Sequence, residues 1–304
     1  MKRLGERHHP KPIHAFVATP AYDGRVYTDY ALSLAQSCQI ATAEGIMVTC
    51  GLMANGAFID LARNDFVTRF LAKENATHLF FIDADLKWES SAFIALLKAD
   101  LPICAGAYRR RQEKEDYPVR YYAAPDGGIM VEGGWIMANR VPAGFLCIRR
   151  DVIEKMVANC CNRGYGQQRR IADGLRELRG SLTEVDDLSK LERAIKFVSN
   201  APATGGLIKV VDDAEMAQLF YTKVNDEDRF MGEDFMFCDD YVAQFGKPIP
   251  VWPDLNFVHG GYACNYHQFL ERLCEAEDAG KIVTKAHNSV EIDGEVIVTR
   301  GRAA

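Results

Sequence analysis

The sequence predicts an α/β protein in which helices flank a mixed central β-sheet. Apolar runs alternate with helical segments over residues 13–82, in the order strand, helix, strand, helix, strand. That alternation is typical of a layered α/β domain with a mainly parallel sheet. The run at 78–82 (His-Leu-Phe-Phe-Ile) is almost wholly apolar, which is typical of a strand buried on both faces.

Composition places the chain among ordinary globular proteins. Its 304 residues, 48% hydrophobic and 26% charged, can form one large domain or two smaller ones. The net charge of −6 provides no global attraction to nucleic acid or anionic membranes. Nine scattered cysteines without a C-x-x-C pair suggest neither a zinc site nor a disulfide framework. Lacking a secretion signal and any long apolar stretch, the chain is expected to be cytoplasmic, with no membrane span.

The first half of the chain supplies five elements in order. A strand over 13–19 is expected to end at Pro20, and a helix over 28–44 to end at Gly45. A second strand covers 46–52, and an amphipathic helix covers 58–75 before the strand at 78–82. The apolar residues of the first helix are Tyr30, Leu32, Leu34, Ile40 and Ala43, and those of the second are Ile59, Leu61, Ala62, Phe66, Phe70 and Leu71.

The second half continues the sheet. A helix over 90–99 and a strand over 101–108 precede hairpins at Gly127-Gly128 and Gly133-Gly134. A strand over 141–150 enters a helix that begins near Asp151, and another helix runs from Glu233 to a C-cap at Gly246. An extended edge segment is expected over 247–253, then a helix over about 265–279 and a polar, hairpin-like tail.

The predicted domain organisation is a main domain over 13–264 and a C-terminal helix and tail over 265–304. Residues 151–224 are expected to form a helical insertion, because 165–200 are highly charged and carry two amphipathic helical patterns. Each apolar stripe must pack on the main domain, on the other helix or on a second subunit. A homodimer through this insertion is therefore one predicted assembly.

Two aspartates follow the buried strand directly. Asp83 and Asp85 would point the same way if the extended conformation continued. The carboxyl end of a central strand is where open α/β sheets bind ligands, and two neighbouring carboxylates suit a divalent cation that carries a phosphate-bearing substrate. The competing interpretation is a solvated turn.

Three further stretches carry candidate binding groups. In the turn Thr19-Pro20-Ala21-Tyr22-Asp23-Gly24, Tyr22 could stack on a nucleobase and Thr19 or Asp23 could bond to it, or the turn is an ordinary Pro-Asp-Gly turn. No G-x-G-x-x-G motif follows this strand. Arg63 lies next to an apolar helix stripe, where it would meet a phosphate, a carboxylate or solvent. The run Arg109-Arg110-Arg111 could clamp a diphosphate or an anionic acceptor, or lie in solvent.

The second half contributes an acidic pair and a histidine. Glu233 and Asp234 begin a predicted helix, where carboxylates are also expected simply because they favour the helix dipole. His259 precedes Gly260 and Gly261, and a histidine in that setting is often an ordinary loop residue.

Taken in order, these motifs resemble the GT-A class of nucleotide-sugar glycosyltransferases, in particular the small phage and bacterial proteins related to family 2 enzymes. The resemblance covers residues 13–150 and 225–265 and rests on the ordered set rather than on any one motif. The matching residues are Thr19-Pro20-Ala21-Tyr22-Asp23-Gly24, Arg63-Asn64, Phe81-Ile82-Asp83-Ala84-Asp85, Gly232-Glu233-Asp234-Phe235 and His259-Gly260.

The resemblance implies a GT-A, Rossmann-like fold and a metal-dependent hexosyl- or pentosyltransferase. It implies that Asp83, Asp85 and His259 hold Mn²⁺ or Mg²⁺, with the imidazole favouring Mn²⁺. The donor would be a nucleoside-diphosphate sugar, with a UDP-linked sugar expected first, and its binding residues would be Thr19, Pro20, Ala21, Tyr22, Asp23, Arg63, Asp83, Ala84 and Asp85. Asp234 would be the general base of an inverting enzyme, and Glu233 would assist in binding the acceptor.

Rival functions remain open. A sugar nucleotidyltransferase would share the layout and the metal but usually has a Gly-rich loop after the first strand, which is absent here. A haloacid-dehalogenase-type phosphatase needs Thr or Val where this chain has Lys87. A non-catalytic carbohydrate- or partner-binding module is the third alternative. The acceptor of a transferase could be a glycan, a protein or a modified DNA base, the last of which would need a local basic face.

Overall fold

The computed structural model describes residues 12–54, 58–122, 124, 128–160, 218–225, 228–278, 289–292 and 295–298. The two predicted helices between 165 and 200, and with them the predicted dimer contact, lie outside the described residues. The hairpin expected at Gly127-Gly128 also falls partly outside them.

The first five elements follow the predicted alternation of strands and helices. Their limits differ from the predicted ones by a few residues at most, since hydrophobic periodicity locates an element better than its ends. They are β1 (His14–Ala21), α1 (Thr28–Ala43), β2 (Met47–Ala54), α2 (Ile59–Ala72) and β3 (His78–Ile82).

The remaining elements extend the sheet and, among the described residues, add three smaller ones. They are β4 (Leu86–Trp88), α3 (Ser90–Lys98), β5 (Ile103–Gly106), β6 (Arg120–Tyr121), β7 (Val131–Glu132), β8 (Trp135–Arg140), β9 (Phe145–Arg149), α4 (Arg150–Cys160), β10 (Lys223–Val224), β11 (Phe230–Met231), α7 (Glu233–Phe245), β12 (Ile249–Trp252), β13 (Asn256–His259), β14 (Tyr262–Asn265), α8 (Tyr266–Asp278), β15 (Ser289–Ile292) and β16 (Glu295–Val298).

Within the described residues the central sheet has nine strands and is mixed. Its order is β2-β1-β3-β9-β5-β12-β8-β6, with β7 paired to β8. Strand β1 is parallel to β2 and β3, whereas β9 runs antiparallel between β3 and β5. A separate three-stranded sheet, β14-β13-β4, begins immediately after the turn that ends β3. The prediction of an α/β protein with a mixed central sheet is therefore confirmed.

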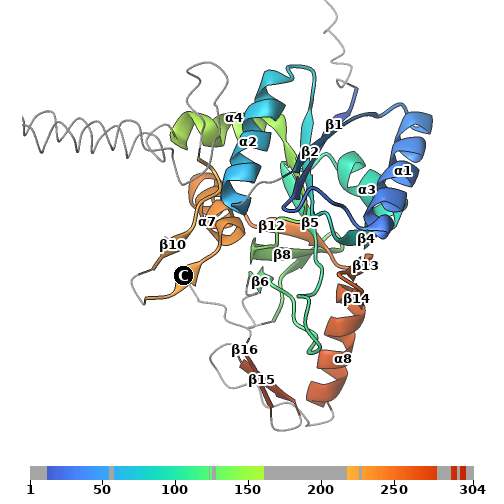
Figure 1. Cartoon of the computed structure of the whole chain (residues 1–304). Helices are drawn as coiled ribbons and strands as arrows, with labels where there is room; N and C mark the ends of the chain where they lie inside the picture. The colour runs from blue at the N-terminus through green and yellow to red at the C-terminus, as the bar shows by residue number, and fades with distance from the viewer. Residues whose placement is uncertain are drawn as a thin grey trace, which may run out of the picture.

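Helices cover both faces of the central sheet. Helices α1 and α3 lie on one side and α2 and α4 on the other (Figure 1). Strand β3 is completely buried between these layers, as its apolar sequence predicts. Its neighbour β9 pairs with it along its whole length, from His78 opposite Arg149 to Ile82 opposite Phe145. The carboxyl end of β3 is thus held by strands on both sides.

The buried face of α1 differs from the predicted one. Leu32 and Ile40 are exposed, while Tyr30, Ser33 and Ser37 are buried. The two serines face inward because their hydroxyls accept hydrogen bonds from Trp88, one from its backbone N–H and one from its indole N–H. A periodicity count that treats serine as a surface residue therefore selects the wrong face of this helix.

Two predictions based on proline were also wrong. Strand β1 continues through Pro20 to Ala21. This is possible because β1 pairs with β3 only as far as Ala18, so the missing N–H of Pro20 removes no hydrogen bond between these two strands. Strand β12 was expected at an edge but lies inside the sheet, between β5 and β8. Its pairing with β5 begins at Val251, after Pro250.

Asn64 joins α2 to a distant segment of the chain. Its side chain is fully buried and its amide nitrogen donates to the Phe220 carbonyl oxygen at 2.7 Å. Its amide oxygen accepts the backbone N–H groups of Leu219 and Phe220, each at 2.9 Å. Phe220 thereby stacks on Phe237 of α7, with ring centroids 4.5 Å apart.

The limits of the predicted insertion were too wide. Val152, Ile153 and Met156 of α4 are buried in the main core, as are Leu219 and Phe220. Residues at both ends of the 151–224 range therefore belong to the main domain.

Local turn predictions were more successful. Gly133 and Gly134 join β7 to β8 with φ values of 59° and 84°, a conformation that suits a two-residue hairpin. Gly246 ends α7 in the left-handed region at φ 61°. Strands β15 and β16 form the hairpin expected in the tail. In the part of the chain described, no helix combines the length and apolar character that a bilayer span requires.

We predict that Asn64→Ala lowers the free energy of unfolding by about 3 kcal/mol or more, because it leaves two buried N–H groups and one carbonyl oxygen without partners. Urea denaturation measures the change. Asn139→Ala is the matched control: Asn139 is only partly buried and, among the described residues, its side chain makes a single bond, to the Tyr121 carbonyl oxygen at 3.3 Å. Equal losses in the two variants would contradict the role assigned to Asn64.

Candidate active site at the carboxyl end of β3

The two aspartates that follow β3 lie on a turn rather than on an extended strand. Ala84 and Asp85 are turn residues, and the Leu86 N–H donates to the Asp83 carbonyl oxygen at 3.2 Å. The expectation that both carboxylates point the same way is therefore wrong. Because the backbone reverses between them, each carboxylate has its own set of partners.

The Asp83 carboxylate faces Arg63 of α2. Arg63 is 3% exposed and donates to Asp83 Oδ1 at 3.2 Å, to Glu233 Oε1 at 3.3 Å and to the Ala143 carbonyl oxygen at 3.4 Å. Burial opposes the charge on Arg63, but the negative charges of Asp83 and Glu233 outweigh it and raise the pKa of this guanidinium. The sequence left a phosphate, a carboxylate or solvent as possible partners of Arg63, and in the structure its partners include two carboxylates.

Tyr108 and Gly144 complete the surroundings of Asp83. The buried Tyr108 hydroxyl donates to Asp83 Oδ2 at 3.0 Å and accepts the Gly144 N–H at 2.9 Å. A side chain at position 144 would collide with both Asp83 and the Tyr108 hydroxyl, so glycine is required there by neighbouring side chains. Tyr108 was absent from the predicted site, since a tyrosine at a strand end has no local signal for this role.

The Asp85 carboxylate faces the other side, toward His259 and Arg111. Its Oδ2 lies 3.4 Å from His259 Nε2 and 2.8 Å from Arg111 Nη1. Burial alone would raise the pKa of Asp85, but the hydrogen bond to His259 and the charges of His259 and Arg111 lower it overall. Asp85 is therefore ionised at neutral pH and holds its charge at this end of the turn.

His259 is oriented by the backbone. Its Nδ1 lies 2.7 Å from the Arg109 carbonyl oxygen, and because a carbonyl can only accept, Nδ1 carries a proton. When Nε2 is protonated it donates to Asp85; in the neutral ring its lone pair faces Asp85, the arrangement found in metal-binding histidines. Hydrogen bonds to Asp85 and Arg109 outweigh burial and raise the pKa of His259, so a cation at Nε2 would compete with a proton.

The three predicted metal ligands are only partly brought together. Among the described residues no three Asp, Glu, His or Cys side chains form a ready metal site. Asp85 Oδ2 and His259 Nε2 do face one another, whereas both oxygens of Asp83 are engaged by Arg63 and Tyr108. An oxygen and an imidazole nitrogen fit a divalent cation, and the Arg111 guanidinium already occupies a cationic position on the same oxygen.

Asp234 has the opposite electrostatic setting to Asp85. It lies in the first turn of α7, where its Oδ1 accepts the Phe235 N–H at 2.7 Å. Burial, followed by the negative charge of Glu233, raises its pKa to about 6, although Arg63 and the hydrogen bond to Phe235 oppose the shift. A carboxylate with that pKa can accept a proton near neutral pH. Simple helix capping does not account for the raised pKa of Asp234.

The predicted nucleotide loop separates into buried and exposed parts. The Thr19 hydroxyl is fully buried and bonds to the Tyr30 hydroxyl, so it is not available to a ligand. Asp23 accepts the Arg25 N–H at 3.1 Å in a turn. Tyr22 is 74% exposed and remains free to stack. The loop also approaches the aspartates, since the Tyr27 N–H donates to the Ala84 carbonyl oxygen at 2.9 Å.

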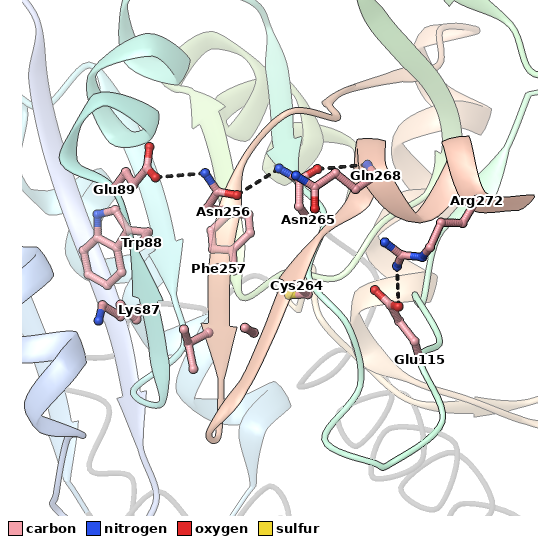
Figure 2. Close-up of a pocket in the computed structure, with 12 residues that line it drawn as sticks. Lys87, Trp88, Glu89, Glu115, Asn256, Phe257, Cys264, Asn265, Gln268 and Arg272 are labelled. Atoms are coloured by element: carbon pink, nitrogen blue, oxygen red, sulfur yellow. Dashed lines mark hydrogen bonds and ion pairs between the residues drawn. The ribbon is translucent and has the colours of Figure 1, made fainter.

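A cavity of about 380 Å³ lies beside the small sheet, between β4, β13, β14 and α8. Figure 2 shows its wall of amide and carboxylate side chains, in which Asn256 bridges Glu89 and Asn265. Arg272 pairs with Glu115 at 2.6 Å on the α8 side. None of the predicted site residues lines this cavity, and its polar groups largely satisfy one another.

Comparisons with known proteins give little support for a family. No family model matches the chain, and no curated protein sequence matches it. Among solved structures, the crystal structure of A197 from STIV matches with a TM-score of 0.39 and 11% sequence identity, over 96% of each chain. A TM-score of that size does not establish a shared fold.

We predict that Asp234→Asn stabilises the protein in a pH-dependent way. The folded-state pKa of about 6 lies above the ordinary value of 3.8, so the folded protein loses stability as the pH rises from about 4 through 6. The amide removes that loss. Chemical denaturation should show a gain of about 1–3 kcal/mol at pH 8 and almost none at pH 4.

Asp239→Asn on the same helix is the matched control. Asp239 accepts two bonds from Arg140, at 2.6 and 2.7 Å, so its substitution should destabilise the protein at pH 8. An Asp234→Asn gain that is the same at both pH values would contradict the raised pKa.

Proposed function

We propose that this protein is a metal-dependent glycosyltransferase with a GT-A fold of the family 2 type, which moves a sugar from a nucleoside-diphosphate sugar to a hydroxyl acceptor. The observation that supports the proposal is a pair of carboxylates with opposite protonation behaviour, Asp85 in the turn after β3 and Asp234 at the start of α7. Asp85 is held ionised beside His259, and Asp234 has a pKa of about 6. The first suits a cation and the second suits a proton acceptor.

In the proposed reaction, Asp234 acts on the acceptor. Its carboxylate removes the proton of the acceptor hydroxyl as that oxygen bonds to the anomeric carbon of the sugar. The bond from the anomeric carbon to the diphosphate breaks, and its electron pair leaves with the diphosphate oxygen. Glu233, held by Arg63 at 3.3 Å, helps to position the acceptor. These roles describe an inverting transfer.

The other end of the site would receive the donor. Asp85 and His259 would hold Mn²⁺ or Mg²⁺, and a cation there would stabilise the negative charge that develops on the leaving diphosphate. Asp83, held by Arg63 and Tyr108, is a rigid acceptor for a ribose hydroxyl rather than a free metal ligand. Tyr22 would stack on the nucleobase, with Pro20, Ala21 and Asp23 shaping its pocket.

The proposal specifies the donor and the acceptor only by chemical class. UDP-linked sugars are the first donors to test, and the acceptor would be a glycan, a protein or a modified DNA base in the cytoplasm. Arg110 pairs with Asp116 and Arg109 is buried, so the three-arginine run contributes little to a basic face for DNA.

A sugar nucleotidyltransferase and a carbohydrate- or partner-binding module are the competing functions. The nucleotidyltransferase would release pyrophosphate from a nucleoside triphosphate and a sugar phosphate. The binding module would turn over neither substrate. The raised pKa of Asp234 favours the transferase, because a binding site has no use for a proton acceptor poised near neutral pH.

The decisive experiment incubates the protein with UDP-, GDP-, ADP- and dTDP-sugars and Mn²⁺ and measures the released nucleoside diphosphate. We expect release with one donor class, and chelation of the metal should abolish it. A parallel reaction with nucleoside triphosphates and sugar 1-phosphates tests for pyrophosphate. Release of neither product, together with no thermal shift by any donor, would overturn the enzymatic proposal.

We predict that Asp85→Asn and Asp234→Asn both reduce turnover, for different reasons. Loss of the charge at Asp85 should weaken Mn²⁺ binding, so its activity should recover in part at higher Mn²⁺ concentration. Loss of the proton acceptor at Asp234 should lower kcat by roughly 10²–10⁴-fold at any Mn²⁺ concentration. Asp100→Asn is the control and should retain most of its kcat, because Asp100 is exposed and pairs with Arg149, which lies opposite the first residue of β3. Full Mn²⁺-dependent turnover by Asp85→Asn would place the cation elsewhere.

A further inference from the structure

Arg111 makes a contact that the proposed reaction cannot retain. Its Nη1 lies 2.8 Å from Asp85 Oδ2, and its side chain is 58% exposed. The same oxygen faces His259 Nε2. A divalent cation held by Asp85 and His259 would need that oxygen, and two cations on one carboxylate oxygen repel each other. Arg111 must therefore leave Asp85 whenever a cation binds there.

The backbone around Arg111 is held in place by its two neighbours. Arg109 is buried and donates to the carbonyl oxygens of Gln112 and Glu113 at 2.6 and 2.7 Å. Arg110 pairs with Asp116 at 2.8 Å, and its N–H donates to the Asp116 carbonyl oxygen. Of the three arginine side chains, that of Arg111 is the one that contacts Asp85. Because the loop is closed on itself, only the exposed side chain of Arg111 has to move.

Gly260 allows Arg111 to approach. A side chain at position 260 would lie 2.5 Å from Cδ of Arg111 and 3.0 Å from its Cγ. The aliphatic part of Arg111 therefore runs directly over the glycine that follows His259. A guanidinium displaced from Asp85 along this path stays beside the cation position, where the diphosphate of a donor would lie.

We propose that Arg111 exchanges partners during donor binding: it neutralises Asp85 in the ligand-free protein and binds the donor's diphosphate once a divalent cation occupies Asp85 and His259. This inference rests on the proposed function. A guanidinium presents a fork of N–H groups that matches phosphate oxygens, and a diphosphate bridged by one cation still carries negative charge for it to meet.

The first measurement is Mn²⁺ binding without nucleotide, followed by the paramagnetic resonance signal of free Mn²⁺. Arg111→Ala removes the competing internal cation, so it should bind Mn²⁺ roughly threefold or more tightly than the wild type. Arg110→Ala is the matched control, since Arg110 contacts Asp116 rather than Asp85, and its Mn²⁺ affinity should not change.

The second measurement is the affinity for UDP, GDP, ADP and dTDP at saturating Mn²⁺, by calorimetry. For the diphosphate that the wild type binds best, Arg111→Ala should weaken binding about tenfold or more, because it removes a charge-assisted bond to phosphate. Arg111→Lys keeps the charge without the fork and should fall between the two. Arg110→Ala should match the wild type.

The outcomes separate this inference from the function on which it rests. Suppose that the wild type binds Mn²⁺ and a nucleoside diphosphate, and that Arg111→Ala changes neither affinity. Arg111 then forms only a surface ion pair, and the proposed exchange of partners is wrong. Tighter Mn²⁺ binding with unchanged nucleotide affinity would also overturn it, since Arg111 would then compete without binding phosphate. If the wild type binds neither ligand, the proposed function itself fails.

Discussion

The buried guanidinium of Arg63 is the interaction on which the site depends. It joins α2 to the turn after β3 through Asp83, to the start of β9 through Ala143, and to α7 through Glu233. These segments are far apart in sequence, and each presents a negative charge or a carbonyl dipole to one buried cation. Removing one partner from such a group leaves an uncompensated charge, which costs about 3–5 kcal/mol. The positions of Asp83 and Glu233 are therefore fixed together.

Two carboxylates of the site are driven to opposite protonation behaviour. Asp85 is stabilised in its charged form by His259 and Arg111, whereas Asp234 is partly buried beside Glu233 and has its pKa raised to about 6. Two aspartates thereby become suited to different roles: Asp85 to binding a cation and Asp234 to accepting a proton. Group transfer from a diphosphate needs both, which is why this separation is the strongest argument for the proposed function.

Most helices and strands could be predicted because their signals are local. The apolar run of β3, the alternation from β1 to β3 and the left-handed glycine after α7 depend only on neighbouring residues. Predictions failed where a distant partner decided the outcome. Ser33 and Ser37 are buried because Trp88 donates to them, and Pro250 lies inside the sheet because the pairing of β12 with β5 begins one residue later.

The sequence by itself determined that two aspartates follow a buried strand and that a second acidic pair begins a helix far along the chain. Only the tertiary structure decided what each acid does. A turn at Ala84 separates Asp83 from Asp85. Strand pairing brings Tyr108 and Gly144 to Asp83. Strand β13 and the run of three arginines bring His259 and Arg111 to Asp85. The reason is physical: pKa and ligand choice depend on charges within a few ångströms, and here those charges come from residues distant in sequence.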